Sequence, residues 1–234
     1  MKCFVCGGEM KPYFVKKIGV KYLRDIDTFE YERCENCGLT VSKTLYEMSN
    51  DDWKEFNHNA HKDYFNGVLK YEKLDPKWLK RLDLQSDMFV ELLNFRVLKY
   101  DCATMDYGAG DGELANKTNA KLNRIWMKKY DEYMESLDAN YLMQINKGEF
   151  DFIVSSSVFE HLLGNRGEVE KIMEFLKPDG IMALHTLVCE EVPQDQDPDW
   201  YYISPVPVHC TLWTNKAMSI VFKKNGFIGC AYNV

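Results

Sequence analysis

Beyond residue 100 the chain alternates short apolar runs with segments whose apolar positions recur at helical spacing. The apolar runs predict strands over residues 102–108, 124–134, 150–158 and 181–188. The helical spacing predicts helices over 113–122, 159–180 and 214–226, followed by a last strand over 227–234. Strands that alternate with helices imply right-handed crossovers and a parallel sheet, which binds ligands at the carboxyl ends of its strands.

The first hundred residues have a different pattern. β-forming residues predict short strands over 12–20, 27–34 and 38–43. A capping box at Ser49-x-x-Asp52 predicts a helix over 50–65, and Asp75-Pro76 predicts the start of a second helix that ends near Phe95. We therefore expect a small β module over 1–45, a helical region over 46–100 and an α/β domain over 101–234.

Composition narrows the class of protein. The 234 residues carry 29 Lys and Arg against 36 Asp and Glu, a net charge of −7, which argues against a nucleic-acid or anionic-membrane surface. Neither a signal-like start nor an apolar run of membrane-spanning length occurs, so we expect a cytoplasmic protein with no membrane partner. Disulfides are rare in that compartment, and the eight cysteines need another explanation.

Four of these cysteines form two Cys-x-x-Cys pairs, each followed by glycine: Cys3, Cys6, Cys34 and Cys37. Four thiolates in two such turns are typical of a closed, structural zinc site. A nucleic-acid-reading zinc ribbon is the functional alternative. Residues 1–40 carry seven basic and six acidic side chains, which is not a platform for phosphate groups.

A glycine-rich loop follows the first strand of the α/β domain in the stretch MDYGAGDGEL. It places Gly108, Gly110 and Gly112 between a strand and a helix, where small residues allow a ligand to approach the backbone. A plain strand-to-helix turn and a nicotinamide site are the alternatives. A nicotinamide loop would have the pattern Gly-x-Gly-x-x-Gly, which is not the pattern here. Asp131 ends the second strand, and Ser155–Ser157 end a central one.

This succession resembles the class I S-adenosylmethionine (SAM)-dependent methyltransferases over residues 86–234. The resemblance implies a Rossmann-like fold with a mostly parallel sheet, helices on both faces and SAM as the cofactor. The residues it implies for SAM are Asp106, Tyr107, Gly108, Ala109, Gly110 and Gly112 at the methionine part, Asp131 and Glu132 at the ribose, and Ser155 and Ser156 near the amino group. The chain departs from the family pattern twice: Asp138 is only the nearest candidate for the adenine acid, and one of the two final antiparallel strands has no room after Gly226.

A hydroxyl acceptor for the methyl group would benefit from a base that takes its proton. The candidates are His185 at the end of a strand, His209 in the long segment 189–213, and His161 after the serine strand. His58 and His61 on the first helix are weaker candidates. We expect the segment 189–213 to act as an acceptor lid, because loops of that length are uncommon and usually functional.

A four-cysteine zinc module ahead of a methyltransferase domain resembles two groups. One comprises sugar and surface-polysaccharide methyltransferases, and the other comprises ribosomal-RNA guanine methyltransferases whose module ends in a histidine ligand. The acidic charge and the aromatic residues of segment 189–213 favour a small, sugar-like acceptor, a sugar or nucleotide-sugar hydroxyl. An RNA-directed methyltransferase and a non-catalytic zinc-ribbon adaptor on a degenerate SAM fold remain the alternatives.

Overall fold

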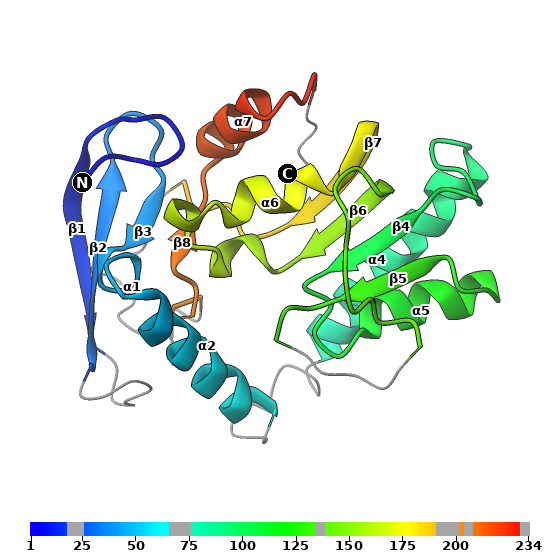
Figure 1. Cartoon of the computed structure of the whole chain (residues 1–234), viewed down its shortest axis with the longest axis horizontal. Helices are drawn as coiled ribbons and strands as arrows, with labels where there is room; N and C mark the ends of the chain where they lie inside the picture. Colours follow the sequence, from blue (N-terminus) through cyan, green and yellow to red (C-terminus); the bar gives the residue numbers. More distant parts are fainter. Residues whose placement is uncertain (18–25, 66–75, 134–138, 191–201, 204–207, 230–234) are drawn as a thin grey trace. The chain divides into compact units, whose positions relative to one another are not determined.

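The computed structural model describes residues 1–17, 26–65, 76–133, 139–190, 202–203 and 208–229, with the side chains of 60–65 left aside. Its contacts divide the chain into two compact units. Unit 1 comprises Met1–Lys62, Phe159–Glu170 and Thr186–Val234, and unit 2 comprises Asp63–Val158 and Lys171–His185. Each unit combines segments that are distant in the sequence (Figure 1). The division expected from sequence at residues 45 and 100 stays a prediction. No helix of the described part is long and apolar enough to cross a membrane.

Unit 2 is built on a four-stranded parallel sheet, which confirms the predicted fold class. Its strands are β4 (Thr104–Tyr107), β5 (Met127–Tyr130), β6 (Phe150–Ser156) and β7 (Leu176–His185), in the order β5-β4-β6-β7. From β4 the chain passes to one neighbour, β5, and later returns to the other, β6. This reversal creates the crevice at which open α/β sheets bind ligands. The segments after β4 and β6 therefore flank the expected site.

Two helices pack their apolar sides against this sheet. They are α4 (Pro76–Asn94), which begins at the predicted proline, and α5 (Glu113–Leu122), which follows the glycine loop directly. Leu82 and Phe89 of α4 and Leu114 of α5 are buried with Phe152 of β6 in one core. This core anchors the sheet beneath the loops at its carboxyl edge.

The predicted helix over 159–180 is wrong in most of its length. The chain instead forms two 3₁₀ turns, η1 (Phe159–His161) and η2 (Gly164–Arg166), then a short helix α6 (Glu168–Glu174), and enters β7 at Leu176. Gly164 lies so close to the Phe4 ring that a Cβ atom there would be 2.1 Å from it. Gly167 has a φ of 70°, which ends the second turn.

Two other strand predictions also need correction. Leu176 pairs with Phe150 and Ile181 pairs with Phe152, so the predicted Pro-Asp-Gly turn is a bulge within β7. Between β5 and β6 the described residues contribute a single isolated bridge, from Lys129 to Tyr141. Of the predicted last strand, 227–229 are irregular and 230–234 lie outside the described residues.

Unit 1 contains an antiparallel sheet with the order β1-β2-β3-β8. Its strands are β1 (Met10–Lys17), β2 (Thr28–Cys34), β3 (Thr40–Ser42) and β8 (Thr211–Leu212). Its helices are α1 (Lys43–Tyr46), α7 (Asn215–Lys224) and most of α2 (Asn50–Phe65). β8 lies near the end of segment 189–213, where the adjacent Trp213 is fully buried against Phe4 and Phe159. Residues 191–201 and 204–207 of this segment lie outside the described residues, so its expected role as an acceptor lid stays a prediction.

Candidate functional site

The glycine loop of unit 2 adopts a backbone that other residues take only with strain. Gly108, Gly110 and Gly112 have φ values of 71°, 56° and 78°, in the left-handed region. A Cβ atom on Gly108 would lie 2.4 Å from Cγ2 of Val158, and one on Gly112 would lie 2.5 Å from Cδ of Lys129. No described atom lies within 4 Å of the position a Cβ atom would take on Gly110. The two outer glycines allow side chains to pack closely against the loop. The middle glycine has open space on the side where a side chain would stand, as a loop that receives a ligand requires.

Side chains from β5 and the segment after it hold the middle glycine. The Gly110 N–H donates to Oδ2 of Asp131 at 2.9 Å, and its carbonyl oxygen accepts a hydrogen bond from the Tyr141 hydroxyl. Oδ1 of Asp131 accepts a second backbone hydrogen bond, from Tyr133 at 2.9 Å. Nζ of Lys129 lies 5.2 Å from the centre of the Tyr141 ring. Asp131 therefore joins the carboxyl end of β5 to the glycine loop, and its remaining lone pairs can accept ribose hydroxyls.

Asp106 lies beneath this loop in β4 and is 3% exposed. Burial raises the pKa of its carboxyl group to about 7, and the nearby carboxylate of Asp131 adds to the rise. A backbone hydrogen bond from Ala115 and the charge of Lys129 oppose the shift only in part. A carboxyl group poised near neutrality responds strongly to any cation that binds beside it.

β6, which ends in the serine residues, and β7 complete the carboxyl edge of the sheet. Oγ of Ser155 is buried and has no hydrogen-bond partner among the described residues, while Ser156 donates to Oε1 of Gln85 at 3.2 Å. Ser157 donates its N–H to the His185 carbonyl oxygen at 2.8 Å, and its hydroxyl lies 3.5 Å from Nδ1 of the same residue. Burial lowers the pKa of His185 to about 4, and the charge of Arg81 contributes. The imidazole is therefore neutral at physiological pH.

Unit 2 thus brings together most of the residues predicted for SAM and one predicted base. Two of the SAM residues have other surroundings: the Tyr107 ring packs in the core against Tyr130 and Phe175, and Glu132 is half-exposed and pairs with Lys171 at 3.7 Å. The backbone N–H of Ala109 is bonded to the Tyr130 carbonyl oxygen at 3.0 Å. The adenine candidate Asp138 lies outside the described residues.

Four residues at this edge were missed from the sequence: Arg81, Gln85, Lys129 and Tyr141. Lys129 left a usable signal, since it occupies an inward-facing position of β5 beside Asp106. The two α4 residues and Tyr141 are distant in the sequence from the motifs they contact, and no local pattern marks them.

The other predicted bases lie in unit 1. The His161 and His209 rings contact each other edge to face with centroids 4.7 Å apart, and Glu160 is beside them. Burial lowers the pKa of His209 to about 4. Of the two weaker candidates on α2, His58 is exposed and the side chain of His61 is not described.

The four N-terminal cysteines meet in unit 1, and the donor set fits zinc. Their sulfur atoms all lie within 4.8 Å of one another, with 3.6 Å between Cys3 and Cys37 and 3.5 Å between Cys6 and Cys34. Zinc–sulfur bonds of about 2.3 Å in a tetrahedron separate the sulfurs by about 3.8 Å, close to these values. The Cys37 thiol lowers the pKa of Cys3 to about 5 through its hydrogen bond.

Comparison with known proteins identifies the family. A family profile described as "Methyltransferase domain" matches residues 56–228. The chain belongs to the methyltransferase-domain family. The resemblance to class I SAM-dependent methyltransferases is thereby confirmed at the level of family and fold. No curated protein sequence matches the chain.

Solved structures with a similar fold include three methyltransferases or candidates for that class. Phosphoethanolamine N-methyltransferase 2 of Haemonchus contortus, bound to SAM, aligns with a TM-score of 0.45 and 19% identity over 62% of this chain and 36% of its own. Coclaurine N-methyltransferase, bound to N-methylheliamine and SAH, aligns with a TM-score of 0.40 and 18% identity over 60% of this chain and 47% of its own. A candidate methyltransferase of Bacillus halodurans aligns with a TM-score of 0.44 and 16% identity over 59% of this chain and 68% of its own. The chain thus spans about a third to a half of the first two proteins.

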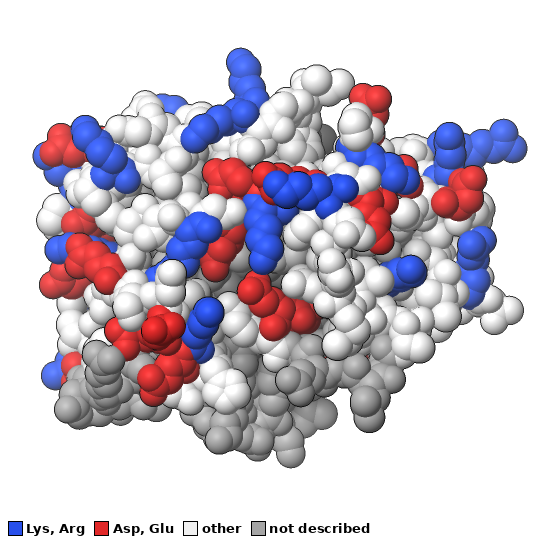
Figure 2. All heavy atoms as spheres, in the orientation of Figure 1, with Lys and Arg blue, Asp and Glu red and all other residues white. Residues whose placement is uncertain are grey.

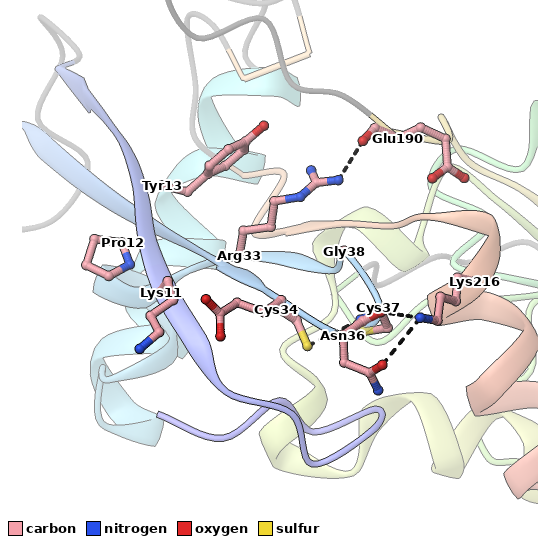
Figure 3. Close-up of a pocket in the computed structure, with 11 residues that line it drawn as sticks. Lys11, Pro12, Tyr13, Arg33, Cys34, Asn36, Cys37, Gly38, Glu190 and Lys216 are labelled. Atoms are coloured by element: carbon pink, nitrogen blue, oxygen red, sulfur yellow. Dashed lines mark hydrogen bonds between the residues drawn. The ribbon is translucent and has the colours of Figure 1, made fainter.

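A surface pocket of about 470 Å³ lies in unit 1 of this methyltransferase, beside the second cysteine turn (Figure 3). Arg33 crosses it to the Glu190 carbonyl oxygen at 2.5 Å and lies 5.1 Å from the centre of the Tyr13 ring. Lys216 donates to Oδ1 of Asn36 at 3.3 Å and to the same residue's carbonyl oxygen. These polar groups satisfy one another, and the lining contains none of the residues predicted for SAM or for the base.

Charges of both signs are interspersed over the visible face of the methyltransferase (Figure 2). No broad area of the described surface in that view carries positive charge alone. Ion pairs account for several of these side chains, such as Lys43 with Glu30 at 3.5 Å in unit 1. An electrostatic footprint for nucleic acid is a stripe of uncompensated Lys and Arg, which this face lacks.

Proposed function

We propose that this methyltransferase transfers the methyl group of SAM to a hydroxyl group of a small polar acceptor, a sugar or a nucleotide sugar. The observation that carries the SAM site is the link between Asp131 and Gly110, at the carboxyl edge of the neighbouring strands β5 and β4. It gathers the glycine loop, a buried carboxyl group and a ribose-binding carboxylate in one unit. The buried Ser155 hydroxyl and the open space at Gly110 fit a bound polar ligand there.

In this proposal the glycine loop and Asp106 hold the methionine part of SAM, and Asp131 holds the ribose. When bound, SAM supplies an electrophilic methyl group on its sulfonium sulfur. The chain's own contribution is to align the acceptor with that group and to exclude water, because an in-line displacement depends mainly on positioning. Ser155 and Ser156 offer polar groups of β6 at the same edge.

His185 is the base that best suits a hydroxyl acceptor. It shares unit 2 with the glycine loop and ends β7, the neighbour of the serine strand. Its imidazole is neutral at physiological pH and can therefore take the proton of the acceptor hydroxyl. The nearby Ser157 hydroxyl can orient the ring through Nδ1. His161 and His209 stay predictions for the acceptor site.

We also propose a structural zinc ion at Cys3, Cys6, Cys34 and Cys37. The distances between the sulfur atoms fit a tetrahedral ion, and Gly8 leaves just enough room for the sulfurs of Cys6 and Cys34. Four cysteine ligands leave no position for water, so this ion would stabilise the fold of unit 1 rather than react. Such a module supports the resemblance to zinc-containing sugar methyltransferases.

The test is a methyl-transfer screen of sugars and nucleotide sugars with labelled SAM, preceded by calorimetry of SAM binding. Saturable SAM binding and label in a sugar product support the proposal. Absence of SAM binding to the folded, zinc-loaded protein would identify a non-catalytic adaptor. Transfer of label to RNA, with binding that weakens steeply as salt rises, would instead identify an RNA-directed enzyme.

A further inference from the structure

Unit 1 contains a second group of potential metal ligands, separate from the four cysteines. Glu160 and His161 come from η1, and His209 comes from the segment before β8. One ligand atom from each of the three side chains lies within 4.8 Å of the others. Ligand atoms this close together can bind a single ion, although His209 is almost 50 positions from the other two residues in the sequence.

The orientation of both imidazole rings is fixed by backbone carbonyl groups. Nδ1 of His161 lies 3.1 Å from the Val208 carbonyl oxygen, and Nδ1 of His209 is hydrogen-bonded to the Tyr202 carbonyl oxygen. A carbonyl oxygen only accepts, so Nδ1 of each ring carries the hydrogen and Nε2 carries the lone pair. Metal-binding histidines are held in this way, with the second nitrogen bonded to a carbonyl or a carboxylate.

The carboxylate is held by a similar outer layer. Glu160 is 2% exposed, and its Oε2 accepts a hydrogen bond from the Thr186 hydroxyl at 2.8 Å. That hydroxyl lies 3.1 Å from the Tyr202 hydroxyl, and the Tyr202 ring lies 4.2 Å from the His209 ring, centre to centre. Thr186 and Tyr202 thus connect the carboxylate to one of the histidines. A carboxylate this deeply buried is favoured when a cation lies beside it.

We propose that Glu160, His161 and His209 bind a divalent first-row transition-metal ion. Two imidazole nitrogens and one carboxylate oxygen are donors that suit Zn²⁺, Fe²⁺, Co²⁺ or Mn²⁺. Three protein ligands leave coordination positions for oxygen ligands such as water or a hydroxyl group of a small molecule, unlike the closed cysteine site. The ion joins η1 to the segment 208–210. The inference goes beyond methyl transfer and depends on neither SAM nor an acceptor.

Cobalt distinguishes the two metal sites within the full-length chain. The metal-free protein is titrated with Co²⁺, and bound cobalt is counted by elemental analysis after desalting. Cobalt on the cysteines absorbs through sulfur-to-metal charge transfer, whereas cobalt on nitrogen and oxygen ligands does not. We expect one equivalent of bound cobalt that adds nothing to the sulfur-to-metal absorption of the cysteine site. If hydrogen bonds alone hold the three side chains together, the wild-type protein will bind cobalt only with sulfur absorption. That result overturns the proposal.

Variants then assign the ligands. Glu160→Gln and His209→Gln should each weaken the binding of this equivalent by more than about 100-fold, since loss of an outer-layer partner alone costs roughly 10–100-fold. Thr186→Val should weaken it by about 10–100-fold. His58→Gln, a change at an exposed histidine of α2, is the matched control and should keep the full equivalent. Retention of this equivalent in both ligand variants overturns the assignment, and near-UV circular dichroism shows that the variants are folded.

Discussion

The carboxylate of Asp131 accepts a hydrogen bond from the Gly110 N–H at 2.9 Å, across 21 residues of sequence. The contact fixes the middle of the glycine loop to the end of the neighbouring strand. It also places the carboxylate where the proposed function needs an acceptor for ribose hydroxyls. In the proposed function Asp131 therefore has two roles, to shape the loop and to bind the cofactor, and the two should respond differently to substitution.

Asp131→Ala should weaken SAM binding by about 10–100-fold, because hydrogen bonds to a charged group contribute roughly 1.5–3 kcal/mol. Asp131→Asn retains one oxygen that can accept from Gly110, so it should keep the stability of the loop and still lose affinity. Calorimetry with SAM and urea unfolding separate these effects. Asp101→Ala, at an exposed carboxylate in unit 2, is the control. Equal SAM affinity in wild type and Asp131→Ala would contradict the ribose assignment.

The buried carboxyl group of Asp106 should couple SAM binding to proton release. Its pKa is about 7 in the folded protein against 3.8 for an ordinary aspartate. The cationic methionine part of SAM favours the ionised form, so a proton must leave when SAM binds below pH 7. We expect affinity to rise from pH 5 to 7 and to level off above that. Calorimetry at pH 6 in buffers of different ionisation enthalpy should show proton release, and Asp106→Asn should abolish it.

The same shift predicts the pH dependence of stability without SAM. The folded state holds the Asp106 proton at pH values where the unfolded chain has already released it. The contribution of this group is therefore fully present below its unfolded pKa and is lost as the pH rises through about 7. The difference in unfolding free energy between wild type and Asp106→Asn should change over that interval and stay constant above it. A constant difference throughout would contradict the raised pKa.

Gly112→Ala should destabilise the methyltransferase by about 1–3 kcal/mol, the usual cost of overpacking a dense interior. The added Cβ atom would lie 2.5 Å from Cδ of Lys129, a side chain only 1% exposed, and the residue has a φ of 78°. Gly148→Ala is the matched control, because its φ is 64° and its surroundings are open. The difference between the unfolding free energies of the two variants, measured by urea unfolding, isolates the steric cost of the added Cβ atom. Equal unfolding free energies would show that Lys129 moves aside without cost.

Local signals were sufficient to predict the parallel sheet, the glycine loop and the cysteine cluster. Gly-x-Gly-x-Gly after an apolar strand and two Cys-x-x-Cys turns each specify their geometry within a few residues. Asp131 was predicted from its place at the end of β5. Its contact with Gly110 follows from the pairing of β4 and β5, in which Asp106 lies opposite Lys129.

The features that were missed depend on contacts between distant residues. Gln85 reaches Ser156 from α4, and Tyr141 reaches Gly110 across 31 positions. The helix predicted over 159–180 has acceptable apolar spacing, but Gly164 lies against the Phe4 ring and interrupts it. β8 is two residues long and forms because β3 offers it an edge, which apolar spacing in segment 189–213 does not show.

Gly8→Ala should weaken zinc binding at the four cysteines. A Cβ atom at this position would lie 2.9 Å from Sγ of Cys34 and 3.2 Å from Sγ of Cys6, so the sulfurs would have to separate. We expect about 10–100-fold lower affinity, from roughly 1–3 kcal/mol of crowding. Gly7→Ala changes the same turn at a φ of 70° with no atom within 4 Å, so it tests backbone strain alone. Competition with a chromophoric chelator measures both variants. Wild-type affinity in Gly8→Ala would exclude the proposed arrangement.

His185→Gln should lower kcat by about 10²–10⁴-fold, the usual contribution of a general base, while the Kd for SAM stays unchanged. The substitution keeps a polar side chain beside Ser157 and removes the proton-accepting nitrogen. Glu91→Gln is the control, because its side chain is exposed on α4 and has no part in the proposed site. Turnover is measured with the acceptor found in the sugar screen, and a variant as active as wild type would rule out His185 as the base.

The pH profile gives an independent measure of the same assignment. Burial and Arg81 lower the pKa of His185 to about 4, so the acid limb of kcat/KM should lie near pH 4 and not near the 6.5 of an ordinary histidine. Arg81→Gln removes the positive charge and should move this limb to higher pH, because the imidazolium then has less repulsion to overcome. An acid limb that Arg81→Gln leaves in place would show that another group accepts the proton.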